Sequence, residues 1–437
     1  MGRQLELLDV SNNQLRKLPK SIYTLRGEVN ASNNIIVELP VVTATKKTKP
    51  TIESLILQSN NITELPESFE RLMYLLKLDV AHNQITQIPH TMINMPYLAD
   101  LNLENNQIWE LPEDFGRLAF SLTKINVQNN KLDKLPSSIG KLTRCTEMNF
   151  ANNKIYELPV TLSGCKRLKN LNVSNNQIQF CDVLKEMNFL LWLDLSSNSI
   201  ENFPEADLES LQYLDLSKNK LEAMPEKLKA MKMLKKFKLA HNNITSLKTE
   251  LGEGQLIEEI DLSYNNLEGE IGFDFQKIRM IQRLNLSHNE IKSLNSTIIK
   301  MEYLRELNLS HNKFVTLQRL PKTLSRLDVS SNEWKLDEPH YESHRNTFLL
   351  SIMADLMTLT HLSMANIGLQ KVPKVIQSYL DLKEVDLSHN KIEEIDGSIF
   401  NQVCNLLPFS SNVLAMFSFA TFPDLIYRTI SLSRYQR

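Results

Sequence analysis

The sequence predicts an α/β repeat solenoid, in which every repeat adds one short strand to a concave parallel β-sheet. Three observations support this prediction. A leucine-rich motif returns about 17 times, at a usual step of about 23 residues. Within each copy, apolar and polar residues alternate over the length of a short strand. Many copies then carry a proline at one fixed position, which favours 3₁₀ or extended backbone, or at most a short helix, on the convex side.

The repeat is L-x-x-L-x-L-x-x-N-x-L, and it can be followed over residues 5–395. Its ninth position holds Asn in every copy except the one with Ile367. The central copies place at this position Asn83, Asn106, Asn130, Asn153, Asn176, Asn198, Asn219, Asn242, Asn265, Asn289 and Asn312. This spacing is the signature of the leucine-rich repeat, so the predicted fold is a leucine-rich-repeat horseshoe.

The copy at Leu211–Leu216 shows how each strand is expected to lie. The period-2 alternation of a strand points Leu214 and Leu216 inward, and it leaves Tyr213 and Asp215 on the exposed face of the sheet. The ninth-position Asn is expected to be buried, where its side-chain amide can satisfy backbone groups of the turn that leaves the strand. Removing one such Asn should therefore cost on the order of 1–3 kcal/mol.

The segment Leu135-Pro136-Ser137-Ser138-Ile139-Gly140-Lys141-Leu142 fits the longer consensus LPxxIxxLxxLxxLxLxxNxL. In this respect the chain resembles the intracellular Ras-group repeats of Scribble- and Erbin-type scaffolds. The resemblance implies a cytosolic protein-binding scaffold in signalling or polarity, with partners such as small GTPases, kinases or phosphatases. The chain departs from those scaffolds because it carries no downstream PDZ, GTPase, kinase or phosphatase segment.

The net charge and the spacing of the cysteines indicate which kinds of partner and which cellular compartment to expect. Lys and Arg number 49 and Asp and Glu 51, giving a formal net charge of −2. The chain therefore has no overall basic field to hold nucleic acid or an anionic membrane surface. Cys145, Cys165, Cys181 and Cys404 are scattered without the spacing of a disulfide cap or a zinc site. With no secretory signal at residues 1–5, a cytoplasmic location is expected.

Breaks in the repeat suggest four segments. Residues 1–334 are expected to form the main array, 335–358 an insertion with helical spacing, 359–395 the last two repeats and 396–437 a non-repeat cap or tail. One continuous solenoid with a bulging helix is favoured over two arrays, because insertions in repeat proteins normally map to loops. In the tail, the apolar run 413–422 is too short for a membrane anchor, so a cap is favoured. A further alternative is that the chain is a fragment.

Several recurring residues could in principle carry chemistry. Histidine recurs at one repeat position, at His82, His241, His288, His311 and His389. Metal binding is a weak interpretation, because Asn, Ser, Lys and Tyr occupy the same position elsewhere. The strands also carry Asp or Asn at a fixed outward position, where surface hydrogen bonding is expected. No phosphate-binding glycine loop, zinc-protease helix, serine nucleophile elbow or kinase signature occurs, so no catalytic residue, cofactor or small-molecule substrate is predicted.

The outward strand positions suggest a binding surface. Aromatic residues at two adjacent strands are typical anchors, and the charges that follow change sign from strand to strand. The residues predicted to contact a partner are Trp192, Tyr213, Lys236, Lys238, Glu259, Arg283, Arg305 and Arg326, the three arginines forming a basic strip. The alternative is a solvated face on which the two aromatics pack against their neighbours.

The sequence thus predicts a non-enzymatic protein–protein interaction scaffold or adaptor in intracellular signalling, which docks a folded protein on its concave sheet. One alternative is the recognition half of a larger enzyme, such as a repeat-bearing phosphatase or kinase. A secreted or membrane-anchored receptor ectodomain is a third hypothesis. That hypothesis would require an upstream signal peptide and cysteine-rich caps.

Overall fold

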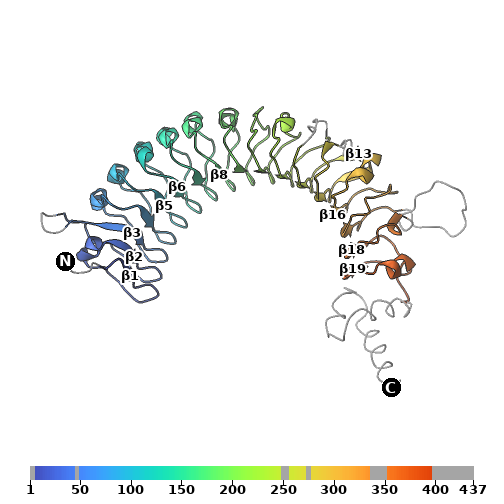
Figure 1. Ribbon diagram of the computed structural model, residues 1–437, viewed down its shortest axis with the longest axis horizontal. Coiled ribbons are helices and arrows are strands. Elements are labelled where there is room, and N and C mark those ends of the chain that lie inside the picture. The colour runs from blue at the N-terminus through green and yellow to red at the C-terminus, as the bar shows by residue number, and fades with distance from the viewer. Residues whose placement is uncertain (1–4, 45–48, 248–254, 272–276, 335–351, 396–437) are drawn as a thin grey trace, which may run out of the picture. The chain divides into compact units, whose positions relative to one another are not determined.

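A computed structural model describes residues 5–44, 49–247, 255–271, 277–334 and 352–395 (Figure 1). The chain divides into two compact units. The first unit comprises Met1–Leu221 and Pro225–Leu234, and the second comprises Glu222–Met224 and Lys235–Arg437. Within each unit, the strands line one side of the coiled chain and the 3₁₀ turns line the other (Figure 1). The predicted leucine-rich-repeat solenoid is confirmed.

Among the described residues of the first unit, ten short strands pair in chain order, all parallel. They are β1 (Leu7–Asp9), β2 (Gly27–Asn30), β3 (Ile52–Ile56), β4 (Lys77–Asp79), β5 (Asp100–Asn102), β6 (Lys124–Asn126), β7 (Glu147–Asn149), β8 (Asn170–Asn172), β9 (Trp192–Asp194) and β10 (Tyr213–Asp215). Corresponding repeat positions lie side by side, as in the pairing of Leu193 with Leu214. The inward leucines of successive strands therefore form one continuous core.

The second unit continues the same design with seven described strands in parallel order. They are β11 (Lys236–Lys238), β12 (Glu259–Asp261), β14 (Arg283–Asn285), β16 (Glu306–Asn308), β17 (Arg326–Asp328), β18 (His361–Ser363) and β19 (Glu384–Asp386). A separate two-stranded sheet pairs β13 (Glu268–Ile271) with β15 (Glu290–Leu294). Each main strand again buries its middle residue, for example Phe237 in β11.

The opposite side of both units is built from 3₁₀ turns. These are η1 (Lys20–Thr24), η2 (Glu67–Arg71), η3 (His90–Asn94), η4 (Phe115–Phe120), η5 (Ser137–Lys141), η6 (Val160–Gly164), η7 (Asp182–Glu186), η8 (Leu228–Ala230), η10 (Ser296–Lys300) and η11 (Lys374–Ser378). Proline directly precedes several of them, as Pro136 precedes η5 and Pro159 precedes η6. The fixed φ of proline suits the start of such a turn, so the predicted 3₁₀ side is confirmed.

Glycines allow three consecutive 3₁₀ turns to approach closely. A Cβ atom added to Gly140 in η5 would lie 1.8 Å from the backbone oxygen of Thr161. The corresponding distances are 2.0 Å from Gly116 to the oxygen of Ser138, and 2.4 Å from Gly164 to the oxygen of Gly140. Real Cβ atoms do not approach a backbone atom so closely. The backbones of η4, η5 and η6 therefore stack in contact only because these positions lack a side chain.

The ninth-position asparagines form the predicted ladder. Asn130 donates from Nδ2 to the oxygens of Val127 and Gln128 in its own turn, both at 3.1 Å. It also donates to the oxygen of Leu103 in the preceding repeat at 3.0 Å, while its Oδ1 accepts from the nitrogen of Ile108 at 2.9 Å. The other predicted members also donate to carbonyl oxygens of their own turns, and all are buried or half-buried.

The one gap in this ladder is filled by a tryptophan. Where an asparagine would stand, Ile367 is 6% exposed and cannot donate a hydrogen bond. In the preceding copy, Asn332 donates to the oxygen of Leu309 at 2.9 Å. An asparagine at position 367 would donate in the same way to the oxygen of Val329. The indole Nε1 of Trp334 donates to the oxygen of Val329 at 2.7 Å instead. The same oxygen also accepts from Nδ2 of Asn332 at 3.2 Å, so it keeps two side-chain donors despite the substitution.

Several predicted segments lie partly or wholly outside the described residues. Those are residues 335–351 of the predicted insertion and the whole of 396–437. Of the predicted helix, Ile352 and Met353 are helical and buried. Strand β17 pairs directly with β18, with Arg326 opposite His361, so the ladder of the second unit runs from one side of the insertion to the other. The four segment boundaries remain predictions.

Candidate functional site

The exposed face of the sheet is formed by the first and third residues of each strand. In β9, for example, Trp192 and Asp194 point outward while Leu193 is fully buried. Because the strands pair in register, equivalent outward residues of neighbouring repeats form two rows across the sheet. The chemistry of each face is therefore set by which side chains become neighbours along these rows.

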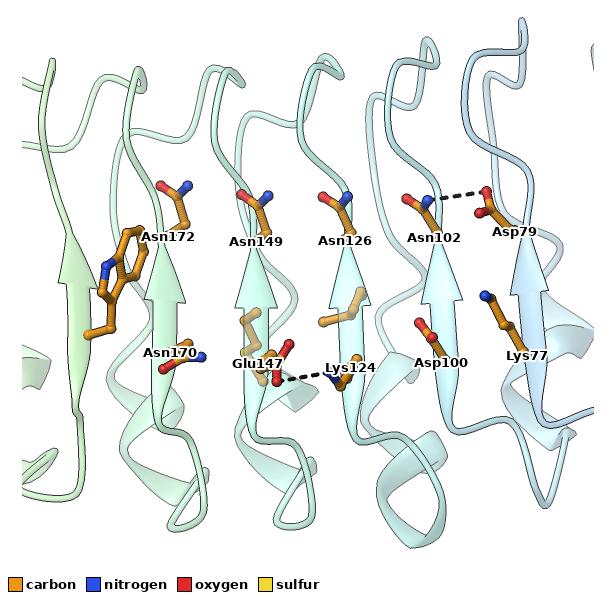
Figure 2. A pocket seen from close by; sticks show the side chains of 13 residues that line it. Lys77, Asp79, Asp100, Asn102, Lys124, Asn126, Glu147, Asn149, Asn170 and Asn172 are labelled. Atoms are coloured by element: carbon orange, nitrogen blue, oxygen red, sulfur yellow. Dashed lines mark hydrogen bonds and ion pairs between the residues drawn. The ribbon is translucent and has the colours of Figure 1, made fainter. Parts of the chain in front are cut away.

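In the first unit, the third-residue row is rich in side-chain amides. Asn102, Asn126, Asn149 and Asn172 occupy it on consecutive strands, and they line an open hollow of about 570 Å³ that also includes Trp192 (Figure 2). This hollow presents both donors and acceptors to solvent.

Neighbouring groups hold these amides in place. Nδ2 of Asn102 donates to Oδ1 of Asp79 at 3.1 Å. Nδ2 of Asn149 donates to Oε1 of Gln128 at 2.7 Å. The floor of the hollow is thereby an ordered polar surface rather than a set of freely moving side chains.

The Asp and Asn side chains of this row also stabilise the turn that follows each strand. Oδ1 of Asp194 accepts from the backbone nitrogen of Ser196 at 2.9 Å, and Oδ1 of Asn172 accepts from that of Ser174 at 3.0 Å. Equivalent bonds recur along both units. The expected surface hydrogen bonding therefore has a local structural purpose, since short Asp and Asn side chains readily bond the backbone two residues on.

Trp192 and Tyr213 form a stacked aromatic pair beside this hollow. Their ring centroids are 5.0 Å apart and their planes differ by 10°. Both side chains are half-buried, and the hydroxyl of Tyr213 donates to Oδ2 of Asp215 at 3.0 Å. Because Tyr213 covers one face of the indole, the other face is turned toward β8 and the hollow. The two rings thus pack against each other, and the indole of Trp192 still has one face available for a partner.

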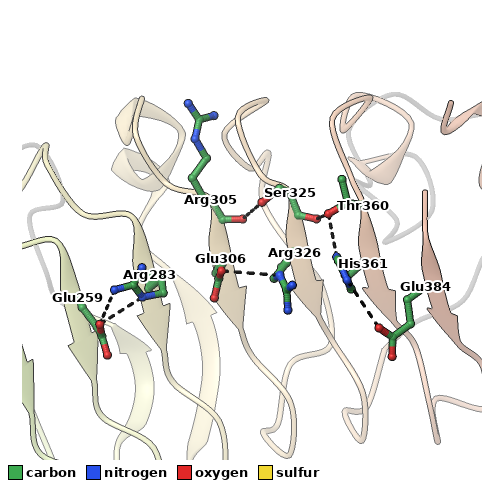
Figure 3. Close-up of polar contacts among 9 residues, drawn as sticks. All are labelled: Glu259, Arg283, Arg305, Glu306, Ser325, Arg326, Thr360, His361 and Glu384. Atoms are coloured by element: carbon green, nitrogen blue, oxygen red, sulfur yellow. Dashed lines mark hydrogen bonds and ion pairs between the residues drawn. The ribbon is translucent and has the colours of Figure 1, made fainter. Parts of the chain in front are cut away.

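In the second unit, the first-residue row alternates in charge (Figure 3). Lys236 lies 3.8 Å from Glu259, which pairs with Arg283 at 2.5 Å. Further along, Arg326 lies 3.7 Å from Glu306. Burial alone would raise the pKa of Glu259, but the hydrogen bond and charge of Arg283 outweigh it and hold this pKa below its ordinary value. Glu259 therefore remains ionised beside its basic neighbours.

This pairing changes the interpretation of the predicted basic strip. Two of its three arginines are matched by a glutamate on the adjacent strand, Arg283 by Glu259 and Arg326 by Glu306. Arg305 precedes β16, and its Nη1 donates to the oxygen of Thr323 at 2.9 Å. The strip presents alternating charge rather than a continuous basic surface. These ion pairs could have been predicted from the sequence, because the paired residues occupy the same position in neighbouring repeats.

The predicted contact residues fall into two groups. Trp192 and Tyr213 lie in the first unit, whereas Lys236, Lys238 and the remaining charged residues lie in the second. Within its own unit, each group is brought together on one exposed sheet face, except that Arg305 lies before β16 and bonds the oxygen of Thr323. Whether they contact a partner stays a prediction for each group separately.

The second unit also contains a column of stacked rings that was not predicted from the sequence. His241, Tyr264, His288 and His311 occupy the same turn position, directly before the ladder asparagine, and all have φ between 53° and 56°. Their ring centroids follow one another at 4.1, 3.9 and 4.0 Å, with planes within 12° of parallel. The sequence shows the recurring histidines, but it does not show that the ring of Tyr264 links His241 to His288.

This geometry disfavours the metal interpretation. Face-to-face imidazoles direct their nitrogen lone pairs along parallel lines, whereas a metal ion needs lone pairs that converge on one point. Among the residues that the structure describes, no group of three or more His, Cys, Asp and Glu side chains could hold a metal ion.

The column should make the second unit sensitive to acid. Burial, followed by the charges of His311 and His241, lowers the pKa of His288 below its ordinary value of 6.5. The unfolded chain then binds a proton more readily than the folded one, so stability falls as pH drops below about 6.5. We expect the urea midpoint to fall less between pH 7.5 and pH 5.5 in His288→Ser than in the wild type. Equal falls in both proteins would contradict this assignment.

The described cysteines offer no nucleophile. Cys145, Cys165 and Cys181 are free and buried, and burial raises the pKa of each thiol to about 12. Since the thiolate is the reactive form, these side chains serve as small apolar groups of the core. No helix among the described residues is long and apolar enough to cross a membrane.

Comparison with known proteins agrees with this architecture. A leucine-rich repeat family model matches residues 50–108, 120–178 and 232–291, and a second leucine-rich repeat model matches residues 4–25, 303–327 and 381–406. The chain belongs to the leucine-rich repeat proteins, whose repeats generally mediate protein–protein interaction. None of the curated proteins compared with this chain is similar enough to count as a relative.

Solved structures with the same fold come from bacteria and plants. A leucine-rich repeat protein of Leptospira interrogans is 27% identical, with a TM-score of 0.68 over 82% of this chain and 88% of that chain. YopM of Yersinia enterocolitica is 23% identical, with a TM-score of 0.57 over 90% and 84%. The Arabidopsis thaliana receptor kinase ectodomain GASSHO1/SCHENGEN3, solved with CASPARIAN STRIP INTEGRITY FACTOR 2, is 24% identical, with a TM-score of 0.61 over 87% and 50%.

Proposed function

We propose that this chain is a non-enzymatic interaction scaffold or adaptor that binds a protein partner on the exposed face of its sheet. The observation that carries the proposal is the stacked Trp192–Tyr213 pair beside the amide-lined hollow of the first unit. Large, rigid aromatic side chains dominate the binding energy of many protein interfaces. Ordered amides around them can pair with the donors and acceptors of a partner's backbone and side chains.

The second unit supports a partner of matching charge pattern. Its row of Lys236, Glu259, Arg283, Glu306 and Arg326 alternates in sign and is neutralised internally. A partner of one uniform charge would meet repulsion at every second strand. A partner that presents alternating charges of its own would be favoured, which contributes more to specificity than to affinity.

The finer role that we propose is in intracellular signalling in the cytoplasm, with partners such as a small GTPase, a kinase or a phosphatase. The Ras-group consensus around Leu135–Leu142 supports this class of partner. The free thiols of Cys145, Cys165 and Cys181 are compatible with a reducing compartment.

A matched pair of tryptophan variants tests the site in the first unit. The full chain is used to capture proteins from cell extract, and the bound proteins are quantified by mass spectrometry. Trp192→Ala is expected to lower recovery of the specific partner at least about tenfold, as for a hot-spot residue. Trp109→Ala removes an exposed tryptophan that lies outside the strands, so recovery should equal that of the wild type. Equal recovery by both variants would reject the site.

A second variant tests the second unit separately. Lys236→Glu combined with Lys238→Glu places negative charge beside Glu259 and reverses the start of the alternating row. Recovery of the same partner should fall, and the remaining binding should depend less on salt concentration. Unchanged recovery and salt dependence would show that this row does not contribute.

A further inference from the structure

The ring column of the second unit ends abruptly at His311. One face of its imidazole is covered by His288, at a centroid separation of 4.0 Å. Since the rings stack along the ladder, the other face is turned toward the next repeat, where Ser331 holds the same turn position with the same positive φ. The repeat after that has Asn366, and a ring returns only with His389. The column therefore lacks rings at two successive positions.

A hollow of about 610 Å³ lies at this gap. His311 and His389 lie at its ends, and small side chains such as Ser330, Ser331 and Ser363 line it between them. The hydroxyls of Ser330 and Ser363 are 2.6 Å apart and form a hydrogen-bonded polar floor. The space thus has an exposed aromatic face at one end and polar groups beneath it.

Two carboxylates give the hollow a negative charge. Asp328 and Asp386 line it, and each accepts hydrogen bonds from its own turn through Oδ1, as Asp328 does from the nitrogen of Ser330 at 3.0 Å. Within the described part of the chain, neither carboxylate is paired with a Lys or Arg side chain. Elsewhere on this face, Glu259 and Glu306 do have such partners. The hollow is therefore a place where negative charge is left for an external cation.

A planar cation fits this combination better than a compact one. Guanidinium stacks flat on aromatic rings and donates in its own plane to carboxylate oxygens, whereas an ammonium group does neither as well. A guanidinium lying over the open face of His311 would be at the level of the repeat that carries Asp328. Oδ2 of Asp328 can then accept from it, with Asp386 adding negative charge at the far side.

We infer that this hollow receives the arginine side chain of a protein partner, stacked on His311 and paired with Asp328. The inference rests on the proposed function and names one chemical feature of the partner, at a site separate from Trp192. A ring added to the column at the gap should block binding of this arginine. Ser331→His would add a ring at a position where His241, His288 and His311 already adopt the same backbone conformation, so this variant should fold normally.

The test uses the full chain with histidine rings labelled for NMR, and a short probe, acetyl-glycyl-arginyl-glycinamide. The His311 ring signals should shift in a saturable manner as the probe is added. The same peptide with citrulline in place of arginine keeps the shape but loses the charge, and it should bind at least about tenfold more weakly. Equal affinity for the two peptides, or no shift at His311, would overturn the inference.

Variants complete the test. Asp328→Asn keeps the turn hydrogen bond, as Asn308 does at the same position, and should weaken arginine binding at least about tenfold. Ser331→His should abolish it, while the matched control Ser197→His, at the same turn position in the first unit, should bind the probe like the wild type. Undiminished binding by Ser331→His would overturn the inference.

Capture of the partner by the Ser331→His and Trp192→Ala variants distinguishes failure of this inference from failure of the proposed function. A captured partner that is lost with Ser331→His supports the arginine site. A partner that is retained undiminished by Ser331→His but lost with Trp192→Ala overturns the arginine site and leaves the proposed function standing. Retention by both variants overturns both.

Discussion

Replacing Asn130 by Ala is expected to lower the free energy of unfolding of the first unit by about 1–3 kcal/mol. The side chain makes four hydrogen bonds, three from Nδ2 and one to Oδ1, and they join two neighbouring repeats. Alanine would leave the nitrogen of Ile108 without a partner in the interior, whereas the oxygen of Leu103 would keep the Nδ2 donor of Asn106 at 3.0 Å. Each buried polar group left unpaired costs about 1–3 kcal/mol.

Urea unfolding followed by circular dichroism measures this loss. Asn170→Ala is the matched control, because Asn170 is an exposed asparagine on the same sheet and its loss should change stability by less than about 0.5 kcal/mol. Asn130→Asp keeps an acceptor for Ile108 but loses the Nδ2 donor, so it should also destabilise. A loss for Asn130→Ala as small as that of the control would contradict the ladder as a source of stability.

Gly140→Ala is expected to destabilise the first unit by about 3 kcal/mol or more, which is the upper range for overpacking a tight interior. The new Cβ would lie 1.8 Å from the oxygen of Thr161 and 2.6 Å from its carbonyl carbon. Both are backbone atoms, so the clash cannot be relieved by turning a side chain. The turns η5 and η6 would have to separate, which disturbs the repeats on both sides.

The direction of this effect distinguishes it from ordinary glycine substitution. Where the backbone is compatible, Gly→Ala usually stabilises by about 0.4–1 kcal/mol because the unfolded chain loses freedom. A clear loss of thermal stability in Gly140→Ala would therefore report the close approach itself. Lys141→Ala, at the exposed next residue, is the control and should be nearly neutral. A stabilised Gly140→Ala would show that η5 and η6 are not in contact.

The fold could be predicted from the sequence because the structure of each repeat is determined by residues close together in the chain. The asparagine of the ladder serves its own turn, the leucines alternate within a few residues, and proline precedes the 3₁₀ turn. Such rules act over short stretches of chain and recur at every copy. The substitution at Ile367 is the exception, since the hydrogen bond from Trp334 to the oxygen of Val329, five residues earlier in the chain, is not part of the recurring pattern.

The candidate site was predicted less completely, because it depends on neighbours about one repeat apart in the chain. Arg283 looks basic along the chain but is neutralised across the sheet by Glu259. Tyr264 looks like an isolated exchange for histidine but joins His241 to His288. Aligning the copies could have shown both juxtapositions. It could not have shown that the rings are parallel, or that a hollow opens beyond His311, because these depend on side-chain rotamers.

The central claim is that a protein partner contacts the strand face rather than the 3₁₀ side. Hydroxyl-radical footprinting of the chain, alone and with its captured partner, tests this most directly. Trp192 and Tyr213 should be oxidised several-fold more slowly in the complex, whereas Phe120 and Phe180, exposed side chains outside the strands, should be oxidised at the same rate. Protection of Phe120 and Phe180 with no change at Trp192 and Tyr213 would contradict the claim and move the interface away from the strand face.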